Sequence, residues 1–239
     1  MFPIRDHNPS EGTPVITFAL IAINVAMFLL TAPWAGGMER LWGELALYPV
    51  AVLHGSHVWG LATHMFLHAG ILHLAGNMLF LWIFGDNLEE QMGPFGFLLF
   101  YLACGFAAAA AQIAVDPWSS IPMVGASGAI AGVMGGYLLM FPRAKVDVIA
   151  IIIIFIRRFT IPAWVMLAVW FGVQLFGGWS AGMEDGIAYW AHTGGFVAGT
   201  VLTVPLFLAR GGRAFWAATR GQPPHPPGFA PSRVPTVRR

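Results

Sequence analysis

Six stretches of the chain are apolar for long enough to cross a lipid bilayer. A helix rises about 1.5 Å per residue, so roughly 20 apolar residues are needed to span about 30 Å of hydrocarbon. The pattern predicts membrane-spanning helices at residues 14–32, 63–85, 95–115, 123–141, 161–178 and 187–209. It therefore predicts an all-α polytopic membrane protein, a bundle of six transmembrane helices.

A further apolar run, residues 148–156, is interrupted by Arg157 and is too short to span. We interpret it as an interfacial or re-entrant segment that leads into the fifth helix. The first span is followed by no small-residue cleavage site, so we expect a retained helix and not a signal peptide.

Positive charge gives the chain an orientation. With six spans, eleven of the twelve Lys and Arg residues fall on one side of the membrane, and only Arg40 falls on the other. Cytoplasmic loops collect such residues, so both termini are expected in the cytoplasm. We expect residues 1–13 to be a cytoplasmic segment, 14–209 to be the six-helix domain and 210–239 to be a disordered Pro- and Arg-rich tail.

Composition supports the membrane assignment, since 57% of residues are apolar and 10% are charged. The net charge of +1 gives no reason to expect a nucleic-acid partner, and the single cysteine, Cys104, excludes an internal disulfide. A compact six-span chain of this type suits a bacterial inner membrane.

Polar side chains gather at one depth of the predicted bundle. Spans two, four and six all begin at the outer side, and their first turns carry His64, His68, His73, Asn77, Ser127 and His192. Polar groups inside a membrane are costly and tend to face the bundle interior or a wet cavity. Their convergence predicts a site near the outer surface.

Ser127 and His192 are ambiguous one by one. Ser127 lies in the small-residue run GASGAIAGVMGGY, where a serine more often packs or bonds to its own backbone. His192 alone could equally be a satisfied interfacial histidine. Together, at matching depth, they suggest a serine nucleophile and its base. Small residues spaced by four would let the two helices touch: Gly128, Gly132 and Gly136 on one, and Ala191, Gly195 and Gly199 on the other.

The histidines of the second span allow two interpretations. His64 and His68 are four residues apart, a spacing that zinc sites use, but no HExxH motif or carboxylate accompanies them. His73 and Asn77 are also four apart and could donate two hydrogen bonds to an oxyanion. We favour the second interpretation and expect neither metal nor cofactor. A small transporter or metal channel remains a rival interpretation.

The motifs HMFLHAGILHLAGN, GASG and AHTGGFVAG, in this order on three predicted helices, resemble those of rhomboid intramembrane serine proteases. The resemblance implies that Ser127 is the nucleophile and His192 the base. It also implies that His73, Asn77 and the backbone N–H of Ser127 stabilise the oxyanion. His68 and the motif glycines Gly125 and Gly128 would support the site.

The resemblance also implies the substrates, which are single-span membrane proteins cleaved near the outer end of their helix, with membrane lipids as the other partner. Entry would be lateral, between the second and fifth helices, with Trp164, Trp170 and Phe171 as candidate lining. Lipid-facing filler is an equal alternative for these aromatics. Three further tryptophans of the first loop suit the headgroup level: Trp34, Trp42 and Trp59.

No carboxylate is expected on a helix near the site, since Asp116, Glu184 and Asp185 fall in predicted loops. We therefore expect a Ser-His dyad with slow turnover. Two residues depart from the family pattern: Gly60 replaces a frequent arginine, and Ala131 replaces an aromatic that packs on the histidine. Another residue must then hold His192. The rival function is a catalytically silent relative that binds membrane helices as a chaperone or sorting factor.

Overall fold

The computed structural model describes residues 2–8, 10–31, 38–152, 155–180 and 186–224. Its longer helices are α1 (Val15–Thr31), α5 (Ile71–Met92), α6 (Pro94–Val115), α7 (Ser127–Met140), α8 (Ala163–Ser180) and α9 (Tyr189–Ala209). Its shorter helices are α2 (Met38–Leu45), α3 (Pro49–Leu53), α4 (Gly60–Thr63), the 3₁₀ turn η2 (His64–Phe66) and α10 (Arg213–Thr219). Its strands are β1 (Phe2–Asp6), β2 (Lys145–Ile152) and β3 (Phe155–Pro162).

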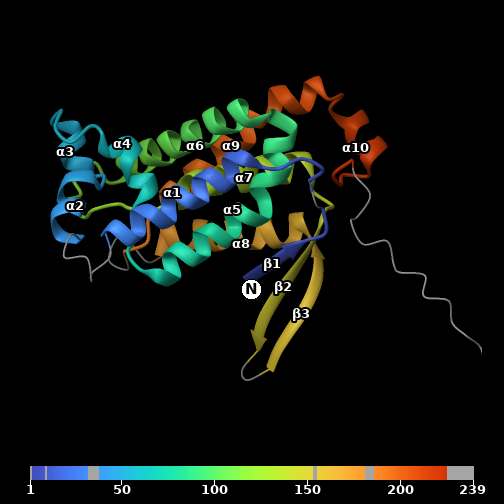
Figure 1. The fold of residues 1–239 in the computed structure, drawn as a ribbon, viewed down its shortest axis with the longest axis horizontal. Helices are drawn as coiled ribbons and strands as arrows, with labels where there is room; N and C mark the ends of the chain where they lie inside the picture. The colour runs from blue at the N-terminus through green and yellow to red at the C-terminus, as the bar shows by residue number, and fades with distance from the viewer. Residues whose placement is uncertain (1, 9, 32–37, 153–154, 181–185, 225–239) are drawn as a thin grey trace, which may run out of the picture.

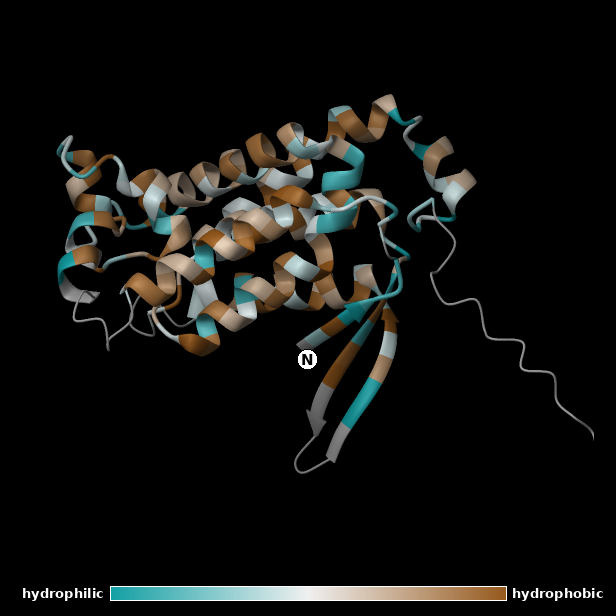
Figure 2. Ribbon diagram, in the orientation of Figure 1, coloured by the Kyte–Doolittle hydropathy of each residue, from teal (hydrophilic) through white to brown (hydrophobic). Residues whose placement is uncertain are grey.

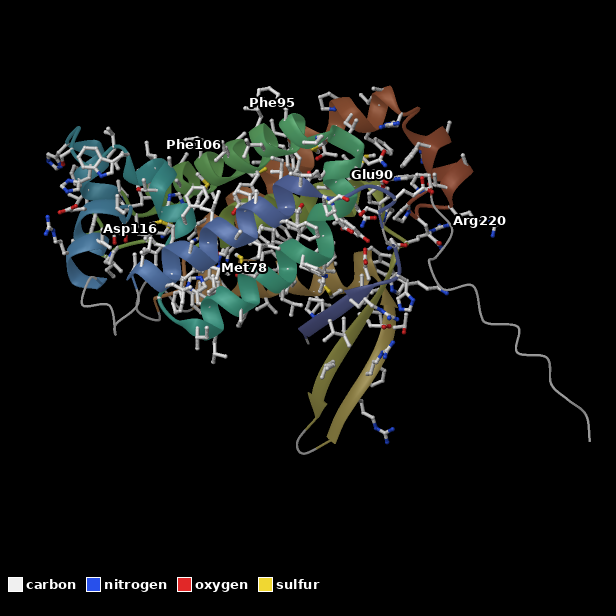
Figure 3. All side chains as sticks on the ribbon, viewed as in Figure 1. Met78, Glu90, Phe95, Phe106, Asp116 and Arg220 are labelled. Carbon is white, nitrogen blue, oxygen red and sulfur yellow. The ribbon has the colours of Figure 1, made fainter. Side chains whose placement is uncertain are left out.

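The six longer helices lie side by side as a bundle, with α2, α3 and α4 at one end and α10 at the other (Figure 1). Apolar residues predominate along the long helices (Figure 2), and many large apolar side chains on them are exposed. Phe95 and Phe106 point outward from α6, whereas Asp116 lies at one end of the bundle and Glu90 and Arg220 lie toward the other (Figure 3). An apolar flank between polar ends is the surface that a bilayer requires, and the chain is an integral membrane protein.

Among the described residues, four helices are long and apolar enough to cross a membrane: α5, α6, α8 and α9. The first and fourth predicted spans correspond to α1 and α7, which have 17 and 14 residues and are shorter than a full span. The sequence located these apolar helices, but the count of six spans is not confirmed by their lengths.

Helix α7 is the central element, because every residue from 128 to 137 is buried. Neighbouring helices α5, α6 and α9 surround it. A helix enclosed on all sides needs small residues where others approach closely, which explains the Gly- and Ala-rich sequence of α7.

The predicted start of the second span at residue 63 is wrong. The chain forms α4 and η2, then turns to extended backbone at Leu67 (φ −100°, ψ 147°) and again at Gly70, and α5 begins only at Ile71. His64 and His68 are therefore not on α5 and share no helical face. Hydropathy did not reveal this break, because the residues on both sides of it are about as apolar as those of a membrane-spanning helix.

The expectation of an all-α chain is wrong around residues 148–156, and the interfacial or re-entrant placement of this segment stays a prediction. The segment belongs to an antiparallel hairpin in which Ile149 of β2 pairs with Arg158 of β3; residues 153–154 lie outside the described ranges. β1 adds a third strand, pairing Phe2 with Ile149. The β-branched isoleucines of β2 favour this pleated arrangement. Figure 1 shows the hairpin projecting from the bundle.

The segments outside the predicted domain are partly ordered. β1 lies within residues 1–13, and α10 lies within the tail, so the expectation of disorder is wrong for residues 213–219. Trp216 fastens α10 to the bundle, because its indole N–H donates to the Leu139 carbonyl at 3.0 Å. Residues 225–239 lie outside the described part of the chain.

Candidate active site

Ser127 is the first residue of α7, as the sequence predicted. The turn before it depends on Gly125, whose φ of 130° is a conformation that favours glycine. The backbone N–H of Gly125 donates to the His64 carbonyl at 2.9 Å, which ties this turn to η2. At a helix start the first N–H groups lack partners within the helix, so the Ser127 hydroxyl lies where an anion is stabilised.

Helix α9 brings His192 to the serine. Its Nε2 lies 2.8 Å from the Ser127 Oγ, and its Nδ1 lies 2.8 Å from Oε1 of Gln174, on α8. Three helices thus contribute one side chain each to a continuous chain of hydrogen bonds. A serine bonded to an imidazole that a third group orients is the arrangement that activates a hydroxyl for attack.

Glycines make the approach of α9 to α7 possible. A Cβ on Gly195 would collide with the Gly128 carbonyl oxygen, and one on Gly199 would collide with that of Gly132. The α7 glycines also face α6, since a Cβ on Gly128 would meet the Ala108 side chain. The small residues therefore serve two interfaces, of which the sequence suggested only the one between α7 and α9.

His73 and Asn77 lie one turn apart on α5 and border the same cavity as Ser127. The His73 ring is close to the serine, because a Cβ on Gly125 would lie 2.8 Å from His73 Nε2 and 3.5 Å from the Ser127 Oγ. Asn77 is buried, and its Nδ2 has no hydrogen-bond partner among the described residues. Such a buried, unused donor is costly unless another group arrives to accept from it.

His68 lies in the extended segment before α5, buried against the edge of the His73 ring with centroids 5.1 Å apart. Neither of its nitrogens has a partner within the described ranges. His64 donates instead from Nδ1 to the Gly60 carbonyl at 2.8 Å, with no role in the serine's hydrogen bonds. In the part of the chain that the structure describes, no three His, Cys, Asp or Glu side chains are placed to hold a metal ion.

A cavity of about 650 Å³ opens over these groups. Its lining includes His73, Asn77, Ser127, Trp170, Gln174 and His192. Most of the exposed lining is apolar, with a few convergent polar atoms, as expected for a site that binds an organic substrate.

The two departures from the family pattern have local compensations. Trp170 of α8 packs beside the His192 ring with centroids 5.9 Å apart, on the ring that an aromatic at Ala131 was expected to contact. At the first loop, the Trp59 indole N–H donates to the Glu44 carbonyl, and Gly60 lies against Ala46 so closely that a Cβ would come within 2.7 Å of its oxygen.

The other aromatic candidates differ in their surroundings. Phe171 stacks on Phe196 of α9 with centroids 4.7 Å apart, whereas Trp164 is exposed on the bundle surface. Trp34, Glu184 and Asp185 lie outside the described residues, as does the side chain of Trp42.

Gln174 was missed at the level of sequence. The signal was present, because Gln174 is a single amide in an otherwise apolar helix, AWVMLAVWFGVQLFGG. Polar residues within a span usually face the bundle interior, and Gln174 follows this rule as the histidines and the serine do.

Comparison with known proteins agrees with the motifs. The family model described as "Rhomboid domain" matches residues 55–209. The chain is 38% identical over 130 residues to "Rhomboid protease GluP" of Bacillus subtilis (strain 168), covering 54% of this chain and 25% of that protein. It is 34% identical over 128 residues to "Putative rhomboid protease YdcA" of the same organism, covering 53% and 62% respectively.

A plant relative, "RHOMBOID-like protein 6, mitochondrial" of Arabidopsis thaliana, is 46% identical over 87 residues, which are 36% of this chain and 28% of that protein. The chain thus spans less than two thirds of the length of each of these three relatives. The similarity is concentrated in the region that contains the candidate site.

Proposed function

We propose that this chain, which belongs to the rhomboid family, is an intramembrane serine endopeptidase with a Ser-His dyad. The observation that carries the proposal is the 2.8 Å contact between the His192 Nε2 and the Ser127 Oγ in an apolar cavity. Two curated relatives carry the word protease in their names, which supports the same class of reaction.

In the proposed reaction, the Ser127 Oγ attacks the carbonyl carbon of the scissile peptide bond while His192 takes the hydroxyl proton at Nε2. The oxyanion accepts hydrogen bonds from Asn77 Nδ2, the His73 ring and the backbone N–H of Ser127. His192 returns the proton to the leaving amine. A water molecule then attacks the acyl-enzyme by the same route in reverse, releasing the carboxylic acid and restoring the serine.

We propose six membrane spans with both termini in the cytoplasm, as in an inner membrane of bacterial type. The short helix α7 is enclosed by its neighbours and need not match the full hydrocarbon thickness. The site then lies near the outer surface. Its substrate would be a single-span protein whose helix is weakened near the outer end, because a hydrogen-bonded helix shields its peptide carbonyls.

The test is cleavage of a single-span substrate in liposomes by the wild type, Ser127→Ala and His192→Ala. We expect both variants to lose at least about 10³-fold in rate while keeping the wild-type melting temperature. Equal cleavage by wild type and Ser127→Ala would exclude the proposal. Substrate that binds to the wild type without being cut would support a helix-binding protein, and inhibition by a chelator would point to a metal enzyme.

A further inference from the structure

We propose that Gln174 is a positioning residue that fixes the protonation pattern and orientation of His192, an inference that rests on the proposed function. Gln174 and Trp170 are one turn apart on α8 and both contact the imidazole. One supplies a hydrogen bond to the ring edge, and the other supplies a flat surface beside the ring. Helix α8 therefore holds the base that α9 carries.

With the amide oxygen of Gln174 facing the ring, as in the structure, the bond favours the tautomer that the chemistry needs. A neutral imidazole carries one proton, and the base must have it on Nδ1 so that Nε2 can accept the serine proton. Oε1 of Gln174, 2.8 Å from Nδ1, accepts that N–H. With the proton on Nε2 instead, a lone pair on Nδ1 would face the oxygen, and Nε2 would have no lone pair for the Ser127 hydroxyl.

The amide end of the bond is also largely buried, at the edge of the cavity. Gln174 is 8% exposed, and it lies on the side of the imidazole opposite Ser127. A hydrogen bond in such a setting is a strong constraint, since water cannot readily replace the lost partner. An amide gives this orientation without placing a second charge in the bundle, where a carboxylate would be costly. It also stabilises the imidazolium less than a carboxylate does, which fits slow turnover.

The experiment compares Gln174→Met, Gln174→Glu and the wild type on the liposome substrate, with purified, monodisperse protein. Methionine keeps the volume and removes the acceptor, whereas glutamate restores an oxygen acceptor. We expect Gln174→Met to lower kcat by about 10- to 100-fold with KM unchanged. We expect Gln174→Glu to recover most of that loss and to move the acidic limb of the pH–rate profile to higher pH, because its charge stabilises the imidazolium.

Gln91→Met, the same substitution near the inner end of α5, is the matched control and should keep the wild-type kcat. Reaction of Ser127 with a fluorophosphonate gives a second readout that needs no substrate entry, and it should slow in Gln174→Met as well. The inference is overturned if Gln174→Met keeps the wild-type kcat while Ser127→Ala is inactive. It is also overturned if glutamate and methionine are equally impaired in folded protein. An inactive wild type would instead overturn the proposed function.

Discussion

The buried Glu89 carboxylate at one end of the bundle and the buried Asn77 and His68 side chains at the other differ in their hydrogen bonds. At the end opposite the site, the Glu89 carboxylate accepts from the N–H groups of Ile16 and Thr17 and from the Thr17 hydroxyl, each at 2.8 Å. At the site end, Asn77 Nδ2 and both His68 nitrogens have no partner among the described residues. The Glu89 carboxylate is fully used by bonds that hold α1 against α5, whereas the site end keeps unused donors that a reacting group can occupy.

The largest effect is expected from alanine substitutions of two asparagines, Asn77 and Asn8, which test this contrast directly. Asn77→Ala should lower the rate of cleavage by about 10²- to 10³-fold, the usual loss for one oxyanion donor, without lowering the melting temperature. Asn8, whose Nδ2 donates to the Tyr137 hydroxyl at 3.0 Å, is the matched control at the end opposite the site. Asn8→Ala should lower the melting temperature and leave the rate of folded protein near the wild-type value. The contrast is broken if Asn77→Ala destabilises the protein as much as Asn8→Ala does.

A smaller effect is expected at the sheet. The buried Asp147 carboxylate accepts from Thr160 at 2.6 Å, lies 2.9 Å from the His7 ring and pairs with Arg158. Asp147→Asn should lower the free energy of unfolding by about 1–2 kcal/mol, since it weakens charge-assisted bonds to partly exposed partners. Chemical denaturation measures this loss. Fluorophosphonate labelling of Ser127 should stay unchanged, and slower labelling would show that the sheet and the site are coupled.

The smallest effect concerns pH. Burial, and next the nearby charge of Asp86, raise the pKa of Asp6 to about 7. An acid whose pKa is raised on folding contributes stability below its unfolded value near 3.8, and that contribution is lost as the pH rises through about 7. Hydrogen exchange of the β1 amides should therefore become faster, beyond its intrinsic pH dependence, between pH 5 and 8. Asp6→Asn should remove this change.

Asp147 should respond to pH in the opposite direction. Burial raises its pKa, but the hydrogen bonds from Thr160 and His7 and the charge of Arg158 outweigh burial and lower the pKa to about 2. Its contribution is complete above about pH 4 and is lost as the pH falls toward 2. The Asp147 carboxylate stays ionised between pH 5 and 8, so the part of any loss of β1 protection in that range that Asp6→Asn removes belongs to Asp6.

Hydropathy predicted the bundle well because long apolar runs have few other uses. It located α6, α8 and α9 to within a few residues and placed Ser127 at a helix start. Hydropathy could not predict elements that form only by pairing with residues far away in the sequence. β1 is a short, mixed segment that becomes a strand only because β2, more than 140 residues later, pairs with it.

The positions of the candidate site residues were predicted about as well as the helices. Motif order and depth predict that Ser127 and His192 lie at the same end of the bundle, because helix direction alone sets which ends meet. The His64 and His68 pairing failed because backbone geometry at Leu67, and not side-chain pattern, ends the preceding turn. Gln174 was missed because an isolated amide carries no motif and shows its purpose only beside the ring that it contacts.

Helix α8 is fastened at one end, where the N–H groups of Ala163 and Trp164 donate to the carbonyls of Ala144 and Pro142 at 2.8 and 3.0 Å. Gln174 lies about 16 Å further along the helix. Because Gln174 is this far from the fixed end, a tilt of α8 by about 10° would displace it by about 3 Å, more than a hydrogen bond tolerates. The angle of one peripheral helix would thus set whether the imidazole keeps its proton on the correct nitrogen.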